Sequence, residues 1–235
     1  MNTIPVPTWA VFRERLLVFA GLPRHDRNSW WFRGECSDQN PLQPTIDRDR
    51  SFKSDSDRER KIKDLLSEFR REVVNLGLGG SVKLDDAFEL LARHHGLPSP
   101  HLDWTRSPWV ASFFAFDRVS SHGSNVVIYA LDRRQIPVQT LQPSGPQARP
   151  GLELVDNPEL VLRNHRAARQ RGVFLRRSTM QDSVETLLDL SLTQFILPAA
   201  EADTALRDLD QMLLNSSMLM YDLDGAARTA DRRTA

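Results

Sequence analysis

The residues with the greatest potential for chemistry are concentrated in two stretches. The longer one, 92–116, carries the adjacent histidines His94 and His95 before a Gly-Leu-Pro turn, and it ends in an aromatic-rich segment. The shorter one, 30–35, places Arg33 within a run of aromatic residues. We expect the two stretches to meet in space and to form one site.

Arg33 follows Phe32 in a segment that should be mostly buried. A buried guanidinium needs a carboxylate, phosphate or carbonyl partner, because leaving it unpaired is costly. One interpretation is a structural salt bridge, for example with Asp103. The other is a fork that grips a ligand phosphate or ribose, and residue chemistry supports both equally. Gly34 would end the strand or let a ligand approach the backbone closely.

The triplet Asp103-Trp104-Thr105 places an acid and a hydroxyl on one side of an extended segment and the indole on the other. It can form part of a binding site. Alternatively, Asp103 orients backbone amides of the loop while Trp104 fills the core.

The histidines His94, His95 and His101 lie near Asp103 in the sequence and could be imagined as metal ligands. Their spacing matches no zinc pattern, because adjacent histidines point to different helix faces and two prolines intervene. We expect no metal. One histidine of the pair should close the helix, and the other should face a pocket.

Four elements must position these residues. Thr8 can cap a helix through about residue 19, and the aromatic run 29–34 favours a strand. Residues 101–105 should form a short extended segment, and Ser107 followed by Pro108 is a good helix start.

The rest of the chain predicts one α+β domain, with small mixed or antiparallel sheets and flanking helices. Ser56 and Glu59 have capping-box spacing before a helical apolar pattern. We expect a loop over 36–55, a surface excursion over 133–158, strands at 125–131, 172–175 and 193–197, and helices at 159–170 and 201–214. The predicted domain covers 1–225, with a helix at 8–20 packed on it, and a frayed tail follows at 226–235.

The composition indicates a soluble globular protein. The chain of 235 residues is 40% hydrophobic and 26% charged, and 31 basic residues balance 31 acidic ones. No global field therefore favours nucleic acid or an anionic membrane. The single cysteine, Cys36, excludes an internal disulfide, and no apolar run approaches the roughly 20 residues that span a bilayer. We expect a cytoplasmic protein without membrane association.

Several motifs in order resemble the FRG-domain family, over about 30–225. They are Phe32-Arg33-Gly34, His94-His95-Gly96-Leu97-Pro98, Leu102-Asp103-Trp104-Thr105, Ser107-Pro108, Ala111-Ser112-Phe113-Phe114-Ala115, Gln170-Arg171-Gly172-Val173-Phe174 and 219–225. The sequence departs from the family pattern at Ser99, Pro100 and His101, where one expected pocket arginine is missing.

The family's layout is similar to that of ADP-ribosyltransferases, which implies such a fold and NAD as the substrate. The resemblance implies that Arg33 grips the diphosphate or ribose and that Thr105 or Ser107 holds the nicotinamide ribose. His95 or Asp103 would shape the nicotinamide pocket, and Gln170 would lie near the acceptor. The implied catalytic set is Arg33, Asp103, Thr105 and Gln170, and the implied NAD-binding set is Arg33, Gly34, His94, His95, Trp104 and Ser107.

A carboxylate that orients the ribose hydroxyl is also expected. Glu153, Glu159 and Glu185 are candidates by elimination. The implied function is transfer of ADP-ribose to a protein or nucleic acid, as in a bacterial toxin or phage-defence effector, which a neutralising or regulatory partner protein would control. One alternative is a non-catalytic module that binds a nucleotide or partner. A second is a metal-dependent hydrolase or nuclease that uses His94, His95 and Asp103.

Overall fold

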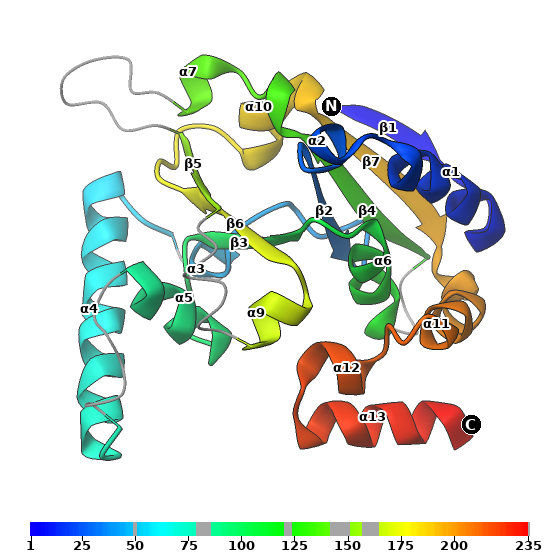
Figure 1. Ribbon diagram of the computed structural model, residues 1–235. Helices are drawn as coiled ribbons and strands as arrows, with labels where there is room; N and C mark the ends of the chain where they lie inside the picture. The colour runs from blue at the N-terminus through cyan, green and yellow to red at the C-terminus, as the bar shows by residue number, and fades with distance from the viewer. Residues whose placement is uncertain (49–50, 79–85, 120–123, 142–150, 157–164, 235) are drawn as a thin grey trace.

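The computed structural model describes residues 1–48, 51–78, 86–119, 124–141, 151–156 and 165–234. In this part of the chain seven strands form one sheet in the order β1-β7-β4-β2-β3-β6-β5 (Figure 1). The strands are β1 (Asn2–Pro5), β2 (Trp30–Glu35), β3 (His101–Thr105), β4 (Asn125–Asp132), β5 (Leu152–Val155), β6 (Gly172–Arg177) and β7 (Leu192–Pro198). The pair β1–β7 is parallel and the other neighbours are antiparallel. The predicted single α+β domain is confirmed.

The helices flank this sheet (Figure 1). They are α1 (Trp9–Gly21), α2 (Arg24–Arg27), α3 (Thr45–Arg48), α4 (Asp55–Asn75), α5 (Asp86–His94), α6 (Pro108–Asp117), α7 (Val138–Leu141), α9 (His165–Arg169), α10 (Val184–Leu188), α11 (Ala202–Gln211), α12 (Ser216–Met220) and α13 (Leu223–Thr234). Short 3-10 turns occupy Arg133–Gln135, Asp189–Ser191 and Ala199–Glu201. Among the described helices, none combines the length and apolarity that crossing a bilayer requires.

Both faces of the central strand β4 are buried. Val126 and Ile128 belong to a core cluster shared with α1, α6 and α11. Val127 and Leu131 belong to a second cluster with residues of β3, β6 and α10. This double burial explains the continuous apolar run of β4, because a strand covered on both faces has no polar alternation.

Side-chain caps start the two helices nearest the predicted site. Thr8 accepts a hydrogen bond from the backbone N–H of Val11 at 3.3 Å, so α1 begins where expected. Ser107 accepts one from the N–H of Val110 at 3.4 Å, and Pro108 follows as the first helical residue of α6. Both predicted starts are confirmed.

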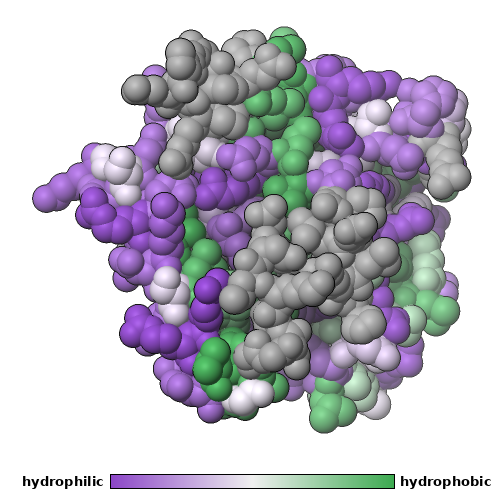
Figure 2. Space-filling model, turned by 60° about the vertical axis from the view of Figure 1, so that its left-hand side comes forward, coloured by the Kyte–Doolittle hydropathy of each residue, from purple (hydrophilic) through white to green (hydrophobic). Residues whose placement is uncertain are grey.

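The predicted capping box of α4 is wrong. Ser54, not Ser56, is the cap, and it accepts a hydrogen bond from the N–H of Asp57 at 3.1 Å. The earlier start places Asp55 and Asp57 in the first turn, where carboxylates complement the positive end of the helix dipole. The face of the molecule on the α4 side is largely hydrophilic over the described residues (Figure 2), as expected for a helix that buries only a narrow stripe.

Two short edge strands were not predicted. β1 has four residues and lies beside β7, while β5 lies inside the segment 133–158 that was expected to be a surface excursion. Strands this short carry almost no periodicity, and their pairing with a long-range partner determines them. Residues 142–150 and 157–158 of the excursion, and 159–164 of the helix expected at 159–170, lie outside the described residues.

The sequence predicted a frayed tail at 226–235, whereas the helix α13 continues through Thr234 in the described residues. The Thr229 hydroxyl accepts a hydrogen bond from the N–H of Ser217 at 2.8 Å. Arg232 pairs with the buried carboxylate of Asp117 at 3.0 Å. Ion pairs and hydrogen bonds to α6 and α12 therefore hold the C-terminal helix in place.

Candidate functional site

The sheet separates into two halves between β2 and β3. These strands pair only through Phe32 and Thr105, whereas β2 pairs with β4 along its whole length. A cavity of about 400 Å³ lies beside this single pair. Its walls come from both halves of the sheet and from the helices α5, α6, α9 and α12.

Most of the predicted site residues line this cavity, so the stretches 30–35 and 92–116 meet in space as expected. They are Arg33, Gly34, His94, Asp103, Trp104, Thr105 and Gln170. His95 is exposed and Ser107 lies in a second hollow, so neither lines the cavity.

Arg33 bridges the gap where the strand pairing stops. Its Nη1 donates to the backbone oxygen of Asp103 at 2.7 Å. Its Nε and Nη2 donate to one carboxylate oxygen of Glu35, at 2.8 and 2.5 Å. The structural interpretation of Arg33 is therefore realised, although with the Glu35 carboxylate and not that of Asp103. Residues two apart on a strand share a face, and that spacing could have revealed the pair in the sequence.

The Asp103 carboxylate is held by Arg93 in a bidentate pair, with distances of 2.6 Å from Nε and 2.5 Å from Nη2. Desolvation by the surrounding cavity walls would by itself raise the pKa of Asp103, but Arg93 and then Arg33 outweigh it and hold this pKa below its ordinary value. The side chain is 56% accessible because it faces the cavity. It is an ionised, paired carboxylate and not a proton donor near neutral pH.

The Thr105 hydroxyl is committed to the backbone on both sides. It donates to the backbone oxygen of Gln170 at 2.6 Å and accepts from the N–H of Ser107 at 3.0 Å. In this arrangement the hydroxyl fastens β3 to the turn before β6. The side-chain amide of Gln170 in turn donates to the backbone oxygen of Leu219 at 3.0 Å, so it faces α12.

Gly34 is required by the packing of α6 on β2. A Cβ atom added there would overlap the backbone oxygen of Ala111 and would lie 2.5 Å from the backbone nitrogen of Ala115. The close approach expected at this glycine is therefore made by a helix. Trp104 is 3% exposed and belongs to the second core cluster. It therefore fills the core, which was one of the two roles considered for it from the sequence.

Positive charge predominates among the ionised side chains that line the cavity. Four arginines face three acids, which leaves one excess positive charge (4 − 3); they are Arg33, Arg93, Arg118 and Arg166 against Glu35, Asp103 and Asp117. Burial lowers the pKa of Arg166, and the attraction of Asp222 and Asp103 opposes this shift. A site of this kind attracts anionic ligands.

The histidines are separated from one another. Burial and the charge of Arg166 lower the pKa of His94, so it faces the cavity uncharged. His101 is 3% exposed, and its Nδ1 lies 3.0 Å from the hydroxyl of Ser99. Within the described residues no group of three or more histidines, cysteines, aspartates or glutamates is arranged to hold a metal ion.

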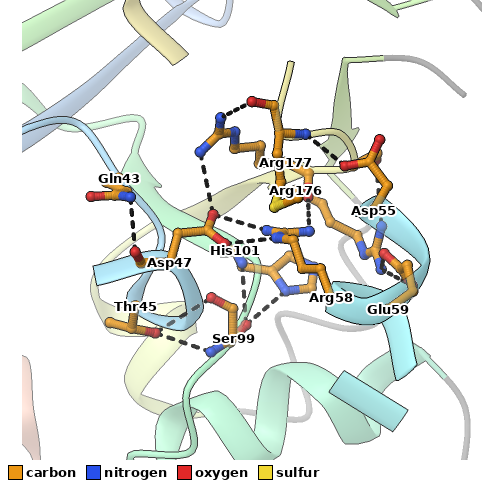
Figure 3. A network of polar contacts seen from close by, with 12 residues as sticks. Gln43, Thr45, Asp47, Asp55, Arg58, Glu59, Ser99, His101, Arg176 and Arg177 are labelled. Carbon is orange, nitrogen blue, oxygen red and sulfur yellow. Dashed lines mark hydrogen bonds and ion pairs between the residues drawn. The ribbon is translucent and has the colours of Figure 1, made fainter. Parts of the chain in front are cut away.

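A buried ionic network supports the wall behind the cavity (Figure 3). Arg58 is fully buried and donates to both carboxylate oxygens of Asp47, at 2.7 and 3.0 Å, and to the backbone oxygen of Arg177 at 3.0 Å. The network ties α3 and α4 to β6. Thr45 lies on the same helix as Asp47 and lines the cavity, where its hydroxyl accepts from Arg93 at 3.4 Å. Sequence reasoning missed this network, since Asp47 lay in a predicted loop and Arg58 at a polar helix position.

None of the carboxylates proposed by elimination has been found in the cavity. Glu153 accepts a hydrogen bond from Ser178, and Glu185 accepts one from the N–H of Leu42; neither lines the cavity. Glu159 lies outside the described residues. Glu35, which does line the cavity, was missed as a candidate.

Part of the chain matches the model of a known protein family. Residues 28–124 match the model of the FRG domain. The matched part covers the Phe-Arg-Gly triplet, the histidine pair and the Asp-Trp-Thr triplet, so the resemblance seen in the sequence is confirmed there. The later motifs at 170–174 and 219–225 lie outside it. Neither the curated proteins nor the solved structures gave a match.

Proposed function

We propose that the cavity of this chain, whose residues 28–124 match the FRG-domain model, binds NAD and that the protein transfers ADP-ribose to a macromolecule. The similarity of the family's layout to that of ADP-ribosyltransferases motivates the choice of reaction. The observation that carries the proposal is the cavity at the break between β2 and β3, where Arg33 lies beside Asp103 and Thr105.

The dimensions and charge of the cavity support a nucleotide ligand. Small-molecule sites commonly have volumes of roughly 300–1,000 Å³, and this cavity of about 400 Å³ is within that range. The excess arginine suits a diphosphate, because guanidinium groups bind phosphate oxygens in a bidentate manner. Arg33 on β2 and Arg166 on α9 both line the cavity and would contact the diphosphate.

The proposed reaction breaks the bond between the ribose C1′ and the nicotinamide nitrogen. Nicotinamide leaves with the bonding electrons, and a nucleophile on the target forms the new bond to C1′ and loses its proton. The transition state carries positive charge on the ribose, which a nearby carboxylate stabilises. Glu35 is the carboxylate in the cavity best placed for this role, because it already lies against Arg33. A cytoplasmic toxin or phage-defence effector controlled by a partner protein would fit such a reaction.

A second candidate is a module that binds a nucleotide without turnover. Glu35 and Asp103 are both engaged by arginines in this arrangement, and the Thr105 hydroxyl donates to one backbone group and accepts from another. These pairings favour a rigid binding site, and catalysis would require the nucleotide to displace at least one of them.

The test is incubation of the purified protein with NAD and a cell extract, followed by mass spectrometry of proteins and nucleic acids. The wild type should add ADP-ribose to a target and release nicotinamide. The double variant Arg33→Met, Glu35→Gln should lose this activity. It removes both charges together, whereas Arg33→Ala alone would leave a buried carboxylate unpaired.

Arg60→Met serves as the control, since this exposed arginine on α4 lies away from the cavity. Melting temperatures show that both variants are folded. NAD binding without any modified product would favour the binding module. Absence of both binding and product would contradict both candidates.

A further inference from the structure

A second hollow of about 140 Å³ adjoins the candidate site. Phe32 lines both, so the single residue pair that joins β2 to β3 lies between them. The hollow is formed where Trp30 on β2 and Arg106 after β3 diverge from each other on the side away from Arg33.

The walls of this hollow combine cations with aromatic rings. The residues that matter are Arg27, Arg106 and Arg171, and the half-buried rings of Phe19, Trp30 and Trp109. Among the residues that the structure describes, no carboxylate lines the hollow. Arg106 is neutralised by Asp156, but Arg27 and Arg171 are exposed, and no side-chain hydrogen bond or ion pair joins them to another described residue.

Arg171 is held in an unusual backbone conformation. Its φ is 51°, in the left-handed region that non-glycine residues rarely adopt. The turn is fixed by hydrogen bonds from its N–H to the oxygen of Ala168 and from the N–H of Arg106 to its own oxygen, both at 3.1 Å. Glycine would satisfy this backbone without strain. The arginine at this position therefore implies a use for its side chain.

We propose that this hollow binds single-stranded nucleic acid. A base would stack on the aromatic rings while Arg27 and Arg171 pair with the adjoining phosphates. Aromatic rings beside unpaired arginines are the combination that binds single strands, because every base offers a flat face and every linkage a negative charge. An acidic peptide would satisfy the arginines but would make no use of the half-buried rings beside them.

The inference rests on the proposed function only in making the nucleic acid the acceptor of ADP-ribose. A base in the hollow would place neighbouring nucleotides at the rim of the main cavity, since Phe32 lines both. Binding itself is measured without NAD, so its failure and the failure of ADP-ribosyl transfer are distinguishable.

The experiment measures fluorescence anisotropy of a labelled single strand of about 12 nucleotides, a length within the usual site size. At about 50 mM salt, the double variant Arg27→Ala, Arg171→Gly should weaken binding on the order of ten-fold relative to the wild type. Loss of two phosphate contacts should also reduce the slope of log K against log salt by about 1.4. Glycine at 171 preserves the turn, so the effect reports on the side chain. The control Arg60→Ala should bind as the wild type does.

Three competitors test the chemistry of the ligand. A duplex of equal length, an abasic strand and a polyglutamate peptide should each compete at least ten-fold more weakly than the single strand. Equal competition by the duplex or the abasic strand would overturn base stacking, and equal competition by polyglutamate would identify an acidic protein partner instead. Unchanged affinity in the double variant, or no binding of the single strand, would also overturn the proposal.

Discussion

At the scale of single residues, the charged groups of the cavity serve the fold and face the ligand space at the same time. Arg33 replaces strand pairing between β2 and β3 and still lines the cavity. Residue chemistry alone could not separate its structural role from a ligand role, because both need a buried guanidinium. The geometry shows that the two roles coincide at one side chain.

His101 gives the chain a predictable dependence of stability on pH. Burial, then the charges of Arg93 and Arg176, lower its pKa to about 3 in the folded state. In the unfolded chain this pKa returns to about 6.5, so below that pH the unfolded state binds a proton that the folded state does not. Stability is therefore fully present above pH 6.5 and is lost as the pH falls toward 3, by about 1.4 kcal/mol per unit.

Urea unfolding at a series of pH values between about 6 and 5 measures this slope. The variant His101→Asn should reduce the slope of the unfolding free energy against pH by about 1.4 kcal/mol per pH unit, the contribution of one proton. This reduction is expected even if the substitution also changes the stability at neutral pH. Loss of the exposed His95, as His95→Asn, is the matched control. An unchanged slope in His101→Asn would show that another group is responsible, and His94, whose pKa is also lowered in the folded state, would be the first to test.

At the scale of elements, Gly34 sets the distance between β2 and α6. The substitution Gly34→Ala would drive a methyl group into the backbone of Ala111 and Ala115, which cannot move without displacing the helix. We expect the free energy of unfolding to fall by more than about 3 kcal/mol, beyond ordinary overpacking of side chains. Denaturant unfolding measures this loss.

Gly21→Ala is the matched control for Gly34→Ala. Nothing lies within 4 Å of a Cβ atom built at Gly21, which ends α1 with an ordinary φ. The change should be neutral or stabilising by up to about 1 kcal/mol. A mild effect at both glycines would refute the packing explanation for the Phe-Arg-Gly triplet.

The helix α13 is the second element with a testable role. Arg232→Ala should destabilise the protein by about 1–3 kcal/mol, because the carboxylate of Asp117, 1% exposed, would lose its closest cationic partner. Hydrogen exchange should then accelerate over 223–234 and at the end of α6. Arg207→Ala, exposed on α11, is the control. Rapid exchange over 223–234 in the wild type would instead support the frayed tail that the sequence suggested.

The elements that sequence reasoning placed correctly are those with local signals. Thr8 and Ser107 mark helix starts, and the apolar run 125–131 marks the buried strand. The missed elements, such as β5, depend on partners distant in sequence. The same distinction holds within the site: the two stretches were found from their composition, whereas the Arg93–Asp103 and Arg58–Asp47 pairs depend on how separate elements meet.

At the scale of the whole molecule, the sheet consists of two halves, β1-β7-β4-β2 and β3-β6-β5, joined at Phe32 and Thr105. The cavity lies at that junction, so a ligand there contacts both halves. The Arg33 bridge to Asp103 spans the same gap. A bound ligand should therefore stabilise the fold by joining the two halves of the sheet, and not only through its contacts with single strands or helices.

The prediction is that ADP-ribose raises the melting temperature and slows hydrogen exchange in both halves at once. At a concentration 100 times Kd, mass action contributes about 2.7 kcal/mol, which corresponds to roughly 5–10 °C for a chain of this length. Protection should appear over 33–36 in one half, over 101–105 in the other, and over 166–170 at α9, which precedes β6. The double variant Arg33→Met, Glu35→Gln should lose both effects, because the group that spans the gap is gone. Protection confined to one half would show that the ligand does not bridge the junction, and the cavity would then belong to one half of the sheet alone.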